Sequence, residues 1–139
     1  MVLAIAGLAM GADETEAIRA ALRRFNEAVR KPEPQPLRAS FTADADYRDA
    51  TRVLRGADAL ASLFADRQAW SERTPPMLQD ESIRLAGSSV AFVDAQLVQY
   101  GSTILKSGVP VVLLLEKAAG EWKIASWRMA AWPVVFPPP

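Results

Sequence analysis

A long helix with one apolar face comes before a run of strands in this sequence, and few architectures can bury both. Residues 13–30 are predicted to be helical because their apolar side chains recur at three- and four-residue steps, as Ile18, Ala21, Leu22, Phe25 and Val29. Asp13 and Glu16 have the spacing of a capping box, so we expect the helix to begin at Asp13. From residue 76 onward the pattern is strand-like. A helix that lays its one apolar stripe on a bent sheet satisfies both patterns, which predicts an α+β fold.

The segment between these two regions holds a short helix, a strand and a third helix. Three prolines within residues 31–36 end the first helix, and Pro36 suits the first turn of a short second one. Residues 46–54 have a period of two, which predicts one strand with a shared face of Tyr47, Asp49, Thr51 and Val53. After Gly56, residues 57–70 return to helical spacing.

The later strands are predicted at residues 82–86, 89–100, 109–116 and 122–132. The run from Val109 to Glu116 is nearly all Val and Leu, so we expect a central strand covered on both faces. Strict alternation along the last strand puts Trp122 on the face opposite to Trp127. Trp122 is therefore expected on the outer side, at a contact between subunits.

Composition excludes several classes of function. Lys plus Arg and Asp plus Glu each number 16, and a net charge of zero argues against a nucleic-acid or membrane-surface partner. The chain has no cysteine and no histidine, which excludes disulfides, Cys/His zinc sites and histidine-based triads. Asp44, Asp46 and Asp49 have no matching ligand cluster elsewhere, so we expect no metal site, and no motif indicates a cofactor.

The two ends of the chain differ in composition from the domain between them. Residues 1–12 are apolar and uncharged, too short to span a bilayer, and similar to a signal peptide that lacks its basic start. They are interpreted either as a leader or as an apolar arm, so export and a cytoplasmic location both stay open. The domain is assigned to residues 13–133, and residues 134–139 form a proline-rich tail.

Two stretches carry a resemblance to a known family. They are residues 41–49 (FTADADYRD) leading to Arg55-Gly56, and residues 120–127 (GEWKIASW) near the end. With the order of elements, these two stretches make residues 14–132 resemble the NTF2-like superfamily, in particular its SnoaL-like and ketosteroid-isomerase-like branch. The resemblance implies a curved, mainly antiparallel sheet wrapped around the long helix, with a conical pocket between them whose mouth is the ligand site. This fold hosts isomerases, cyclases, dehydratases and pure binding modules.

The resemblance implies a catalytic role for Asp49, which matches the position of the proton-shuttling base in the isomerases. If its strand face points inward, burial should raise its pKa and make it a base near neutral pH. The alternative is a rim position in which Asp49 pairs with Arg48, Arg52 or Arg67. The isomerases also use a tyrosine and a second aspartate, and those positions correspond to Phe25 and Leu113 here. The chain is therefore not expected to be a true ketosteroid isomerase.

Further side chains are candidates for contact with a ligand inside the cone, and ordinary core packing is the alternative for each. They are Phe25, Tyr47, Trp127 and Met129, with Trp70 as a lid and Gln96 or Asp94 as a polar contact. The predicted function is binding of a small apolar or mildly polar organic molecule, with Asp49-assisted proton transfer as its catalytic form. The alternative is a non-catalytic association module, and in either case we expect a homodimer.

Overall fold

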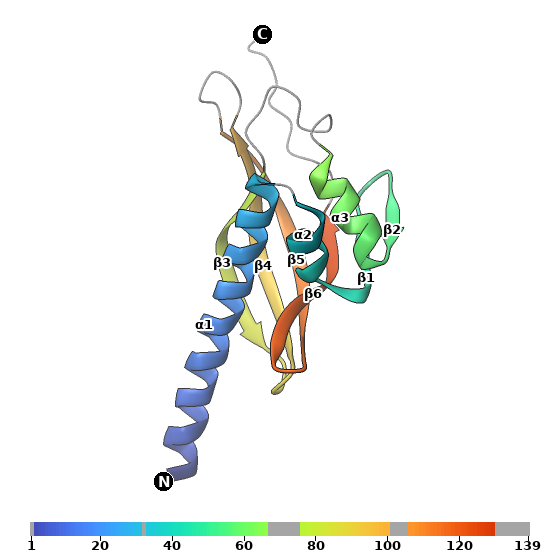
Figure 1. The fold of residues 1–139 in the computed structure, drawn as a ribbon. Coiled ribbons are helices and arrows are strands. Elements are labelled where there is room, and N and C mark those ends of the chain that lie inside the picture. Colours follow the sequence, from blue (N-terminus) through green and yellow to red (C-terminus); the bar gives the residue numbers. More distant parts are fainter. Residues whose placement is uncertain (1, 32, 67–75, 101–105, 130–139) are drawn as a thin grey trace.

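The computed structural model describes residues 2–31, 33–66, 76–100 and 106–129 (Figure 1). These residues form three helices and six strands in one sheet. The elements are α1 (Val2–Arg30), α2 (Pro34–Ala39), β1 (Phe41–Arg48), β2 (Val53–Arg55), α3 (Ala57–Ala65), β3 (Met77–Leu85), β4 (Val90–Tyr100), β5 (Lys106–Ala118) and β6 (Glu121–Met129).

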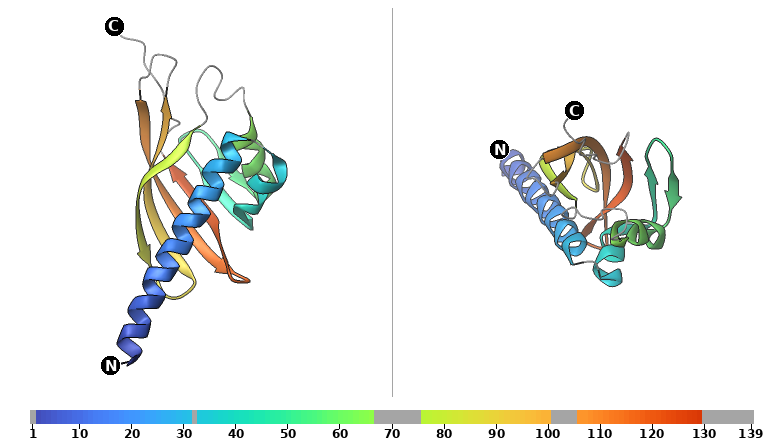
Figure 2. Two further views of the ribbon diagram at one scale, coloured as in Figure 1. Left: turned by 60° about the vertical axis from the view of Figure 1, so that its left-hand side comes forward. Right: turned by 90° about the horizontal axis from the view of Figure 1, so that it is seen from above.

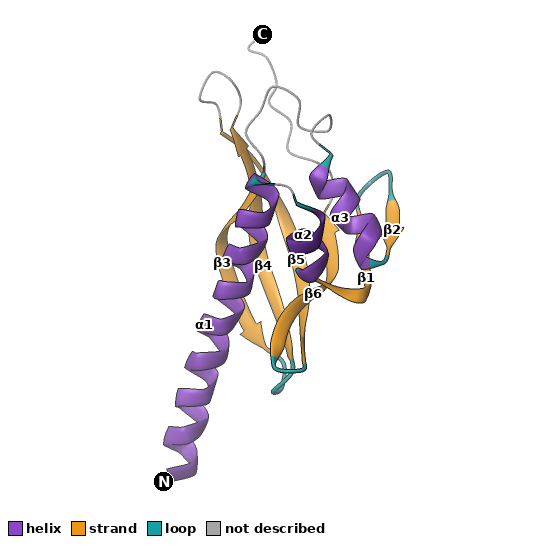
Figure 3. Ribbon diagram, in the orientation of Figure 1, coloured by secondary structure: helices purple, strands orange, loops and turns teal. Residues whose placement is uncertain are grey.

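The sheet has the strand order β2-β1-β6-β5-β4-β3, and every neighbouring pair is antiparallel except β1 and β6. Figures 2 and 3 show the sheet curving, with α1 crossing its concave side and α2 and α3 beside β1. The predicted α+β fold with a curved sheet around a long helix is confirmed.

The register of the sheet defines two levels on its concave face, which we call the inner face. At the lower level Tyr47 pairs with Trp127, Trp127 with Leu113, and Leu113 with Val93. At the next level Met129 pairs with Val111, and Val111 with Ala95. The upper end of the cone is the end toward which α1, β1, β4 and β6 all run (Figure 1).

Five aromatic side chains, here called the aromatic floor, fill the lower level of the cone. The ring centroid of Phe25, on α1, lies 5.1 Å from that of Phe64 and 5.4 Å from that of Trp127. The ring centroids of Phe64 and Trp127 are 4.7 Å apart. Phe41 and Tyr47 complete the cluster through contacts with Phe64. All five are nearly or fully buried, so the apolar stripe of the helix and the inner face of the sheet share one core.

The first helix is longer than its sequence pattern predicts. It begins at Val2, so the predicted start at Asp13 is wrong and no capping box forms there. Instead Glu14 accepts hydrogen bonds from Lys117 Nζ and Trp122 Nε1, both at 2.7 Å, which tie this part of α1 to β5 and β6. The hydrogen bond from Lys117 chiefly holds the pKa of the Glu14 carboxyl below its usual value. Among the described residues, no helix combines the length and hydrophobicity that crossing a bilayer requires.

A β-bulge corrects the expected orientation of Trp122. Ile124 pairs with Leu115 and Ser126 pairs with Leu114, so β6 has one residue more than β5 between these pairs. The extra residue shifts the alternation, and Trp122 and Trp127 both become buried in the common core. Trp122 is therefore not an outward subunit contact.

The prediction that β5 is covered on both of its faces is also wrong. The strand is central in the sheet, but Val112 is 46% exposed on the convex face. A continuous apolar run indicates a strand covered on both faces only when helices lie on both sides, and here the three helices are on one side (Figure 2).

We predict that Phe25→Ala lowers the free energy of unfolding by about 3–5 kcal/mol, because it leaves a cavity between α1 and the other rings of the aromatic floor. Phe92→Ala is the matched control, since Phe92 lies on the convex face and is 36% exposed. Chemical denaturation measures both. Equal losses in the two variants would contradict a core centred on Phe25.

Candidate functional site at the upper end of the cone

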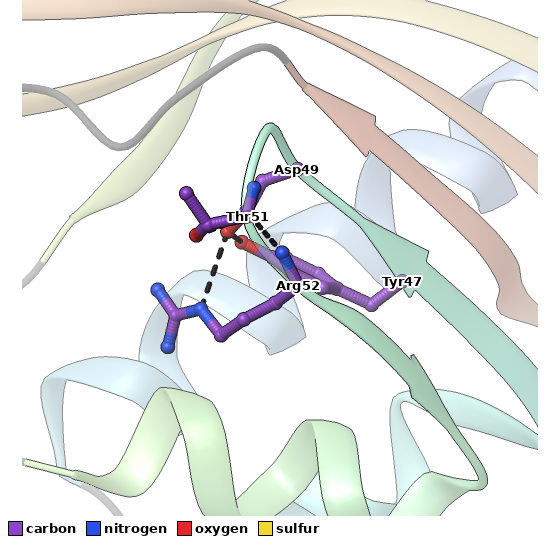
Figure 4. Close-up of polar contacts among 4 residues, drawn as sticks. All are labelled: Tyr47, Asp49, Thr51 and Arg52. Carbon is purple, nitrogen blue, oxygen red and sulfur yellow. Dashed lines mark hydrogen bonds and ion pairs between the residues drawn. The ribbon is translucent and has the colours of Figure 1, made fainter.

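The segment predicted as one strand over residues 46–54 is a hairpin, and Asp49 makes its turn. The Oδ1 atom of Asp49 accepts hydrogen bonds from the backbone N–H groups of Thr51 and Arg52, both at 2.8 Å, and from the Thr51 hydroxyl at 3.2 Å (Figure 4). An aspartate that binds backbone groups two and three residues ahead favours a turn over a continued strand. The expected strand face from Tyr47 to Val53 therefore does not exist.

The other carboxylate oxygen of Asp49 is held from inside the cone and from its rim. Oδ2 accepts a hydrogen bond of 2.5 Å from the Tyr47 hydroxyl and lies 3.4 Å from Arg52 Nε. The Asp49 side chain is 2% exposed, whereas that of Arg52 is 41% exposed. The inward position and the pairing with Arg52 were alternatives in the sequence, and the structure combines them.

These contacts reverse the expected pKa shift of Asp49. Burial pushes the pKa of the carboxyl upward, but hydrogen bonds from Tyr47, Thr51 and Arg52 outweigh burial and hold the pKa below its usual value. The prediction of a raised pKa is wrong. A carboxylate has about four lone-pair positions, and five donors already surround this one.

Tyr47 is the inner partner of this carboxylate. Its pKa is raised, first by burial and then by the hydrogen bond to ionised Asp49, so the hydroxyl stays protonated and donates a hydrogen bond to Asp49. Tyr47 and Asp49 thus form one rigid polar unit at the wall of the cone.

Gln99 is a second buried polar side chain, which the sequence pattern alone did not single out. It is 2% exposed, and Asp49 and Gln99 are the two buried polar or charged residues in the described part of the chain. The register of β4 runs without a shift from Val90 to Tyr100, so Gln99 shares the inner face with Leu97 and lies toward the upper end. Counting alternation from Leu97 could have found it.

Gln96 was predicted to contact the ligand, and that prediction is wrong. It lies on the convex face with Asp94, since the inner positions of β4 are occupied by Ala95 and Leu97. Trp70, the predicted lid, lies outside the described residues. A shift of register by one residue exchanges the two faces of β4. The sequence alone therefore could not decide whether Gln96 and Asp94 face the cone.

The remaining candidates lie in the cone at two levels. Phe25 and Trp127 belong to the aromatic floor, and Met129 is buried one level above it on the inner face. Trp127 is fully buried, and its Nε1 has no hydrogen-bond partner within the described part of the protein. An unpaired buried donor costs about 1–3 kcal/mol, so it marks a place where an acceptor would be stabilising.

The three aspartates of β1 and its turn do not converge. Asp46 forms two hydrogen bonds of 2.9 Å with Arg128, Asp44 accepts one of 3.2 Å from Thr42, and Asp49 makes the turn. The described residues contain no group of three or more acidic side chains arranged to hold a metal ion.

Comparison with solved structures places this architecture in a known class. The chain is similar to an NTF2-like protein with a cystatin-like fold from Novosphingobium aromaticivorans, with a TM-score of 0.79, 14% identity, and coverage of 94% of this chain and 89% of that chain. A protein of the same organism provisionally described as a scytalone dehydratase has a TM-score of 0.75, 15% identity, and coverage of 92% and 89%. One from Shewanella frigidimarina provisionally described as a ketosteroid isomerase has a TM-score of 0.65, 20% identity, and coverage of 82% and 94%.

At such identities these likenesses show the fold alone: an NTF2-like α+β cone. The sequence model described as SnoaL-like domain matches residues 18–131, and the chain belongs to this family. A search of curated proteins by sequence finds no match.

We predict that Asp49→Asn lowers the free energy of unfolding at pH 7 by about 1–3 kcal/mol, because it removes a buried charge that several donors stabilise. The pKa of Asp49 is lower in the folded state than in the unfolded state. The stabilisation that ionised Asp49 provides is therefore complete above the unfolded-state pKa of about 4, and it is lost as the pH falls through the folded-state pKa. Denaturation of both proteins between pH 7 and pH 3 measures this difference.

Asp44→Asn is the control, since Asp44 is exposed and has a single hydrogen bond from Thr42. We expect a change below about 0.5 kcal/mol for it. A difference between the Asp49→Asn variant and the unmodified protein that grows toward low pH would contradict the assignment.

Proposed function

We propose that the protein binds a small, mainly apolar organic molecule at the upper end of its cone. The observation that carries this proposal is the placement of the two buried polar residues, Asp49 and Gln99, above an aromatic floor at the same end of an apolar inner wall. Sites for small organic molecules usually combine an apolar lining with a few polar groups that fix the orientation of the ligand. The unpaired Nε1 of Trp127 supports the same conclusion and favours a ligand with an acceptor such as a carbonyl or ether oxygen.

A true ketosteroid isomerase remains disfavoured in this proposal. The positions that correspond to its two oxyanion-stabilising groups hold Phe25 and Leu113, which are fully buried and apolar. An enolate formed in this cone would lack those donors, and losing even one costs about 3–4 kcal/mol of transition-state stabilisation.

Proton transfer assisted by Asp49 is the catalytic form of the proposal, and the hydrogen bonds of Asp49 limit it. A carboxylate with filled acceptor positions and a lowered pKa is a weak base. The arrangement supports a positioning role better, in which Asp49 accepts the hydrogen bond of the Tyr47 hydroxyl and fixes the position of this group at the wall of the cone. Asp49→Ala would then weaken binding through Tyr47, and unchanged affinity in that variant would remove the role.

Native mass spectrometry of protein purified from its own host tests ligand binding directly, because it reports the mass of a co-bound molecule. We predict that Gln99→Leu weakens affinity for the molecule so identified by roughly 2- to 10-fold, the effect of one hydrogen bond. Gln96→Leu is the matched control, since it changes the same residue type on the same strand but on the convex face. Equal affinities for the Gln99 variant and the unmodified protein would overturn the placement of the ligand.

A second candidate function is association through the convex face of the sheet. Val112 and Phe92 are exposed there, and the half-buried Leu114 pairs with Phe92 and lies two residues from Val112 on the same face of β5. An apolar surface of this kind on a sheet favours pairing with another protein surface, here a second copy of the chain. Both functions are compatible, since the convex face is opposite to the cone.

We predict that Val112→Lys reduces the dimer fraction measured by light scattering after size exclusion, because it places a charge in the apolar surface. Val53→Lys is the control, since Val53 is 57% exposed on β2 at the edge of the sheet. A protein that is monomeric before substitution, or equally dimeric after it, would contradict association through this face.

A further inference from the structure

A cavity of about 610 Å³ lies outside the cone, between α1, α2 and the first half of β6. It is here called the α1–α2 groove, and Figure 1 shows the elements that surround it. Its small lining residues are alanines on the facing helices. They are Ala20, Ala21 and Ala28 of α1 and Ala39 of α2. Larger side chains at these positions would fill the space, so the groove follows from the sequence of the two helices.

The floor of the groove is apolar. Trp122 and Ile124, which the β-bulge turns inward, form it, and both are more than nine-tenths buried. The indole N–H of Trp122 already donates to Glu14, so the part of the ring that faces the groove offers apolar contact. The volume lies within the range of about 300–1,000 Å³ that is usual for small-molecule sites.

The rim of the groove has a positive surplus. Its charged residues are Arg23, Arg24, Glu27, Lys31 and Glu33. Two of these charges are compensated locally: Arg23 pairs with Glu16 at 2.9 Å, and Glu27 pairs with Arg30 at 2.8 Å. No ion pair is found for Arg24, Lys31 or Glu33 within the part of the chain that the structure describes. Two cations, Arg24 and Lys31, and one anion, Glu33, therefore lie at the rim outside these ion pairs.

We propose that the α1–α2 groove is a second binding site, which takes an organic monoanion with an apolar body. The apolar body packs on Trp122 and Ile124, and the anionic group lies at the edge that Arg24 and Lys31 form. Arg24 and Ala28 share one face of α1, and Lys31 follows on the same side directly after the helix, where its N–H still donates to the Glu27 carbonyl. The stripe with Phe25 lies on the neighbouring face, with Ala21 at the border between the two, so the groove and the cone lie on adjacent sides of the same helix.

Two fluorescent probes with the same ring system test this proposal. Anilinonaphthalene sulfonate is a monoanion, and phenylnaphthylamine is its neutral counterpart. We expect the anion to bind the full chain with one site that Ala20→Phe abolishes, because the new ring fills the groove at a half-buried position. The double substitution Arg24→Gln with Lys31→Gln should weaken binding of the anion about fivefold and leave the neutral probe within about twofold.

Arg19→Gln is the matched charge control, since Arg19 is exposed on α1 and does not line the groove. It should leave both affinities unchanged, and thermal unfolding confirms that each variant is folded. Anion binding that survives Ala20→Phe, or that falls equally in the Arg19 and Arg24/Lys31 variants, would overturn the proposal. A change of oligomeric state in the Ala20 variant would also overturn it, since the groove would then be a contact between subunits.

Discussion

The packing of α1 across the concave face of the sheet is the contact on which the other features depend. Phe25 reaches from the helix into the cluster of Phe64 and Trp127, so one residue joins the helix, α3 and β6. A curved sheet with one apolar face must bury that face against another element, and here α1 covers it. The position of the helix also decides where the cone is filled and where its polar groups gather, since the aromatic rings occupy the lower level and leave Asp49 and Gln99 above them.

Two local irregularities place the groups that can act chemically. β1 ends at Arg48, and the turn that Asp49 makes brings its carboxylate back onto the Tyr47 hydroxyl instead of continuing along the strand. The bulge in β6 brings both Trp122 and Trp127 to the buried side, one beneath the α1–α2 groove and the other in the aromatic floor. Each irregularity changes the alternation of side chains, and alternation decides which residues face a ligand.

The first helix thus presents different chemistry on different faces. Its apolar stripe closes the cone, and a neighbouring face of alanines with Arg24 and Lys31 borders the groove. Glu14 joins the helix to Lys117 and Trp122 near the turn between β5 and β6. A disturbance of this helix should therefore affect the cone and the groove together, whereas substitutions on the convex face of the sheet should leave both unchanged.

The sequence by itself determined the order of elements apart from the hairpin of β1 and β2, the α+β class and the apolar stripe from Ile18 to Val29, because these follow from periodicity and from residue types that act locally. It also pointed to Tyr47 and Asp49 as neighbours in the cone. Only the tertiary structure decided the orientation of Trp122, the exclusion of Gln96 and the inclusion of Gln99, because a bulge or a register exchanges the faces of a strand without a clear local signal. The direction of the pKa shift of Asp49 was likewise decided there, since it depends on how many donors from the folded turn surround a buried carboxylate.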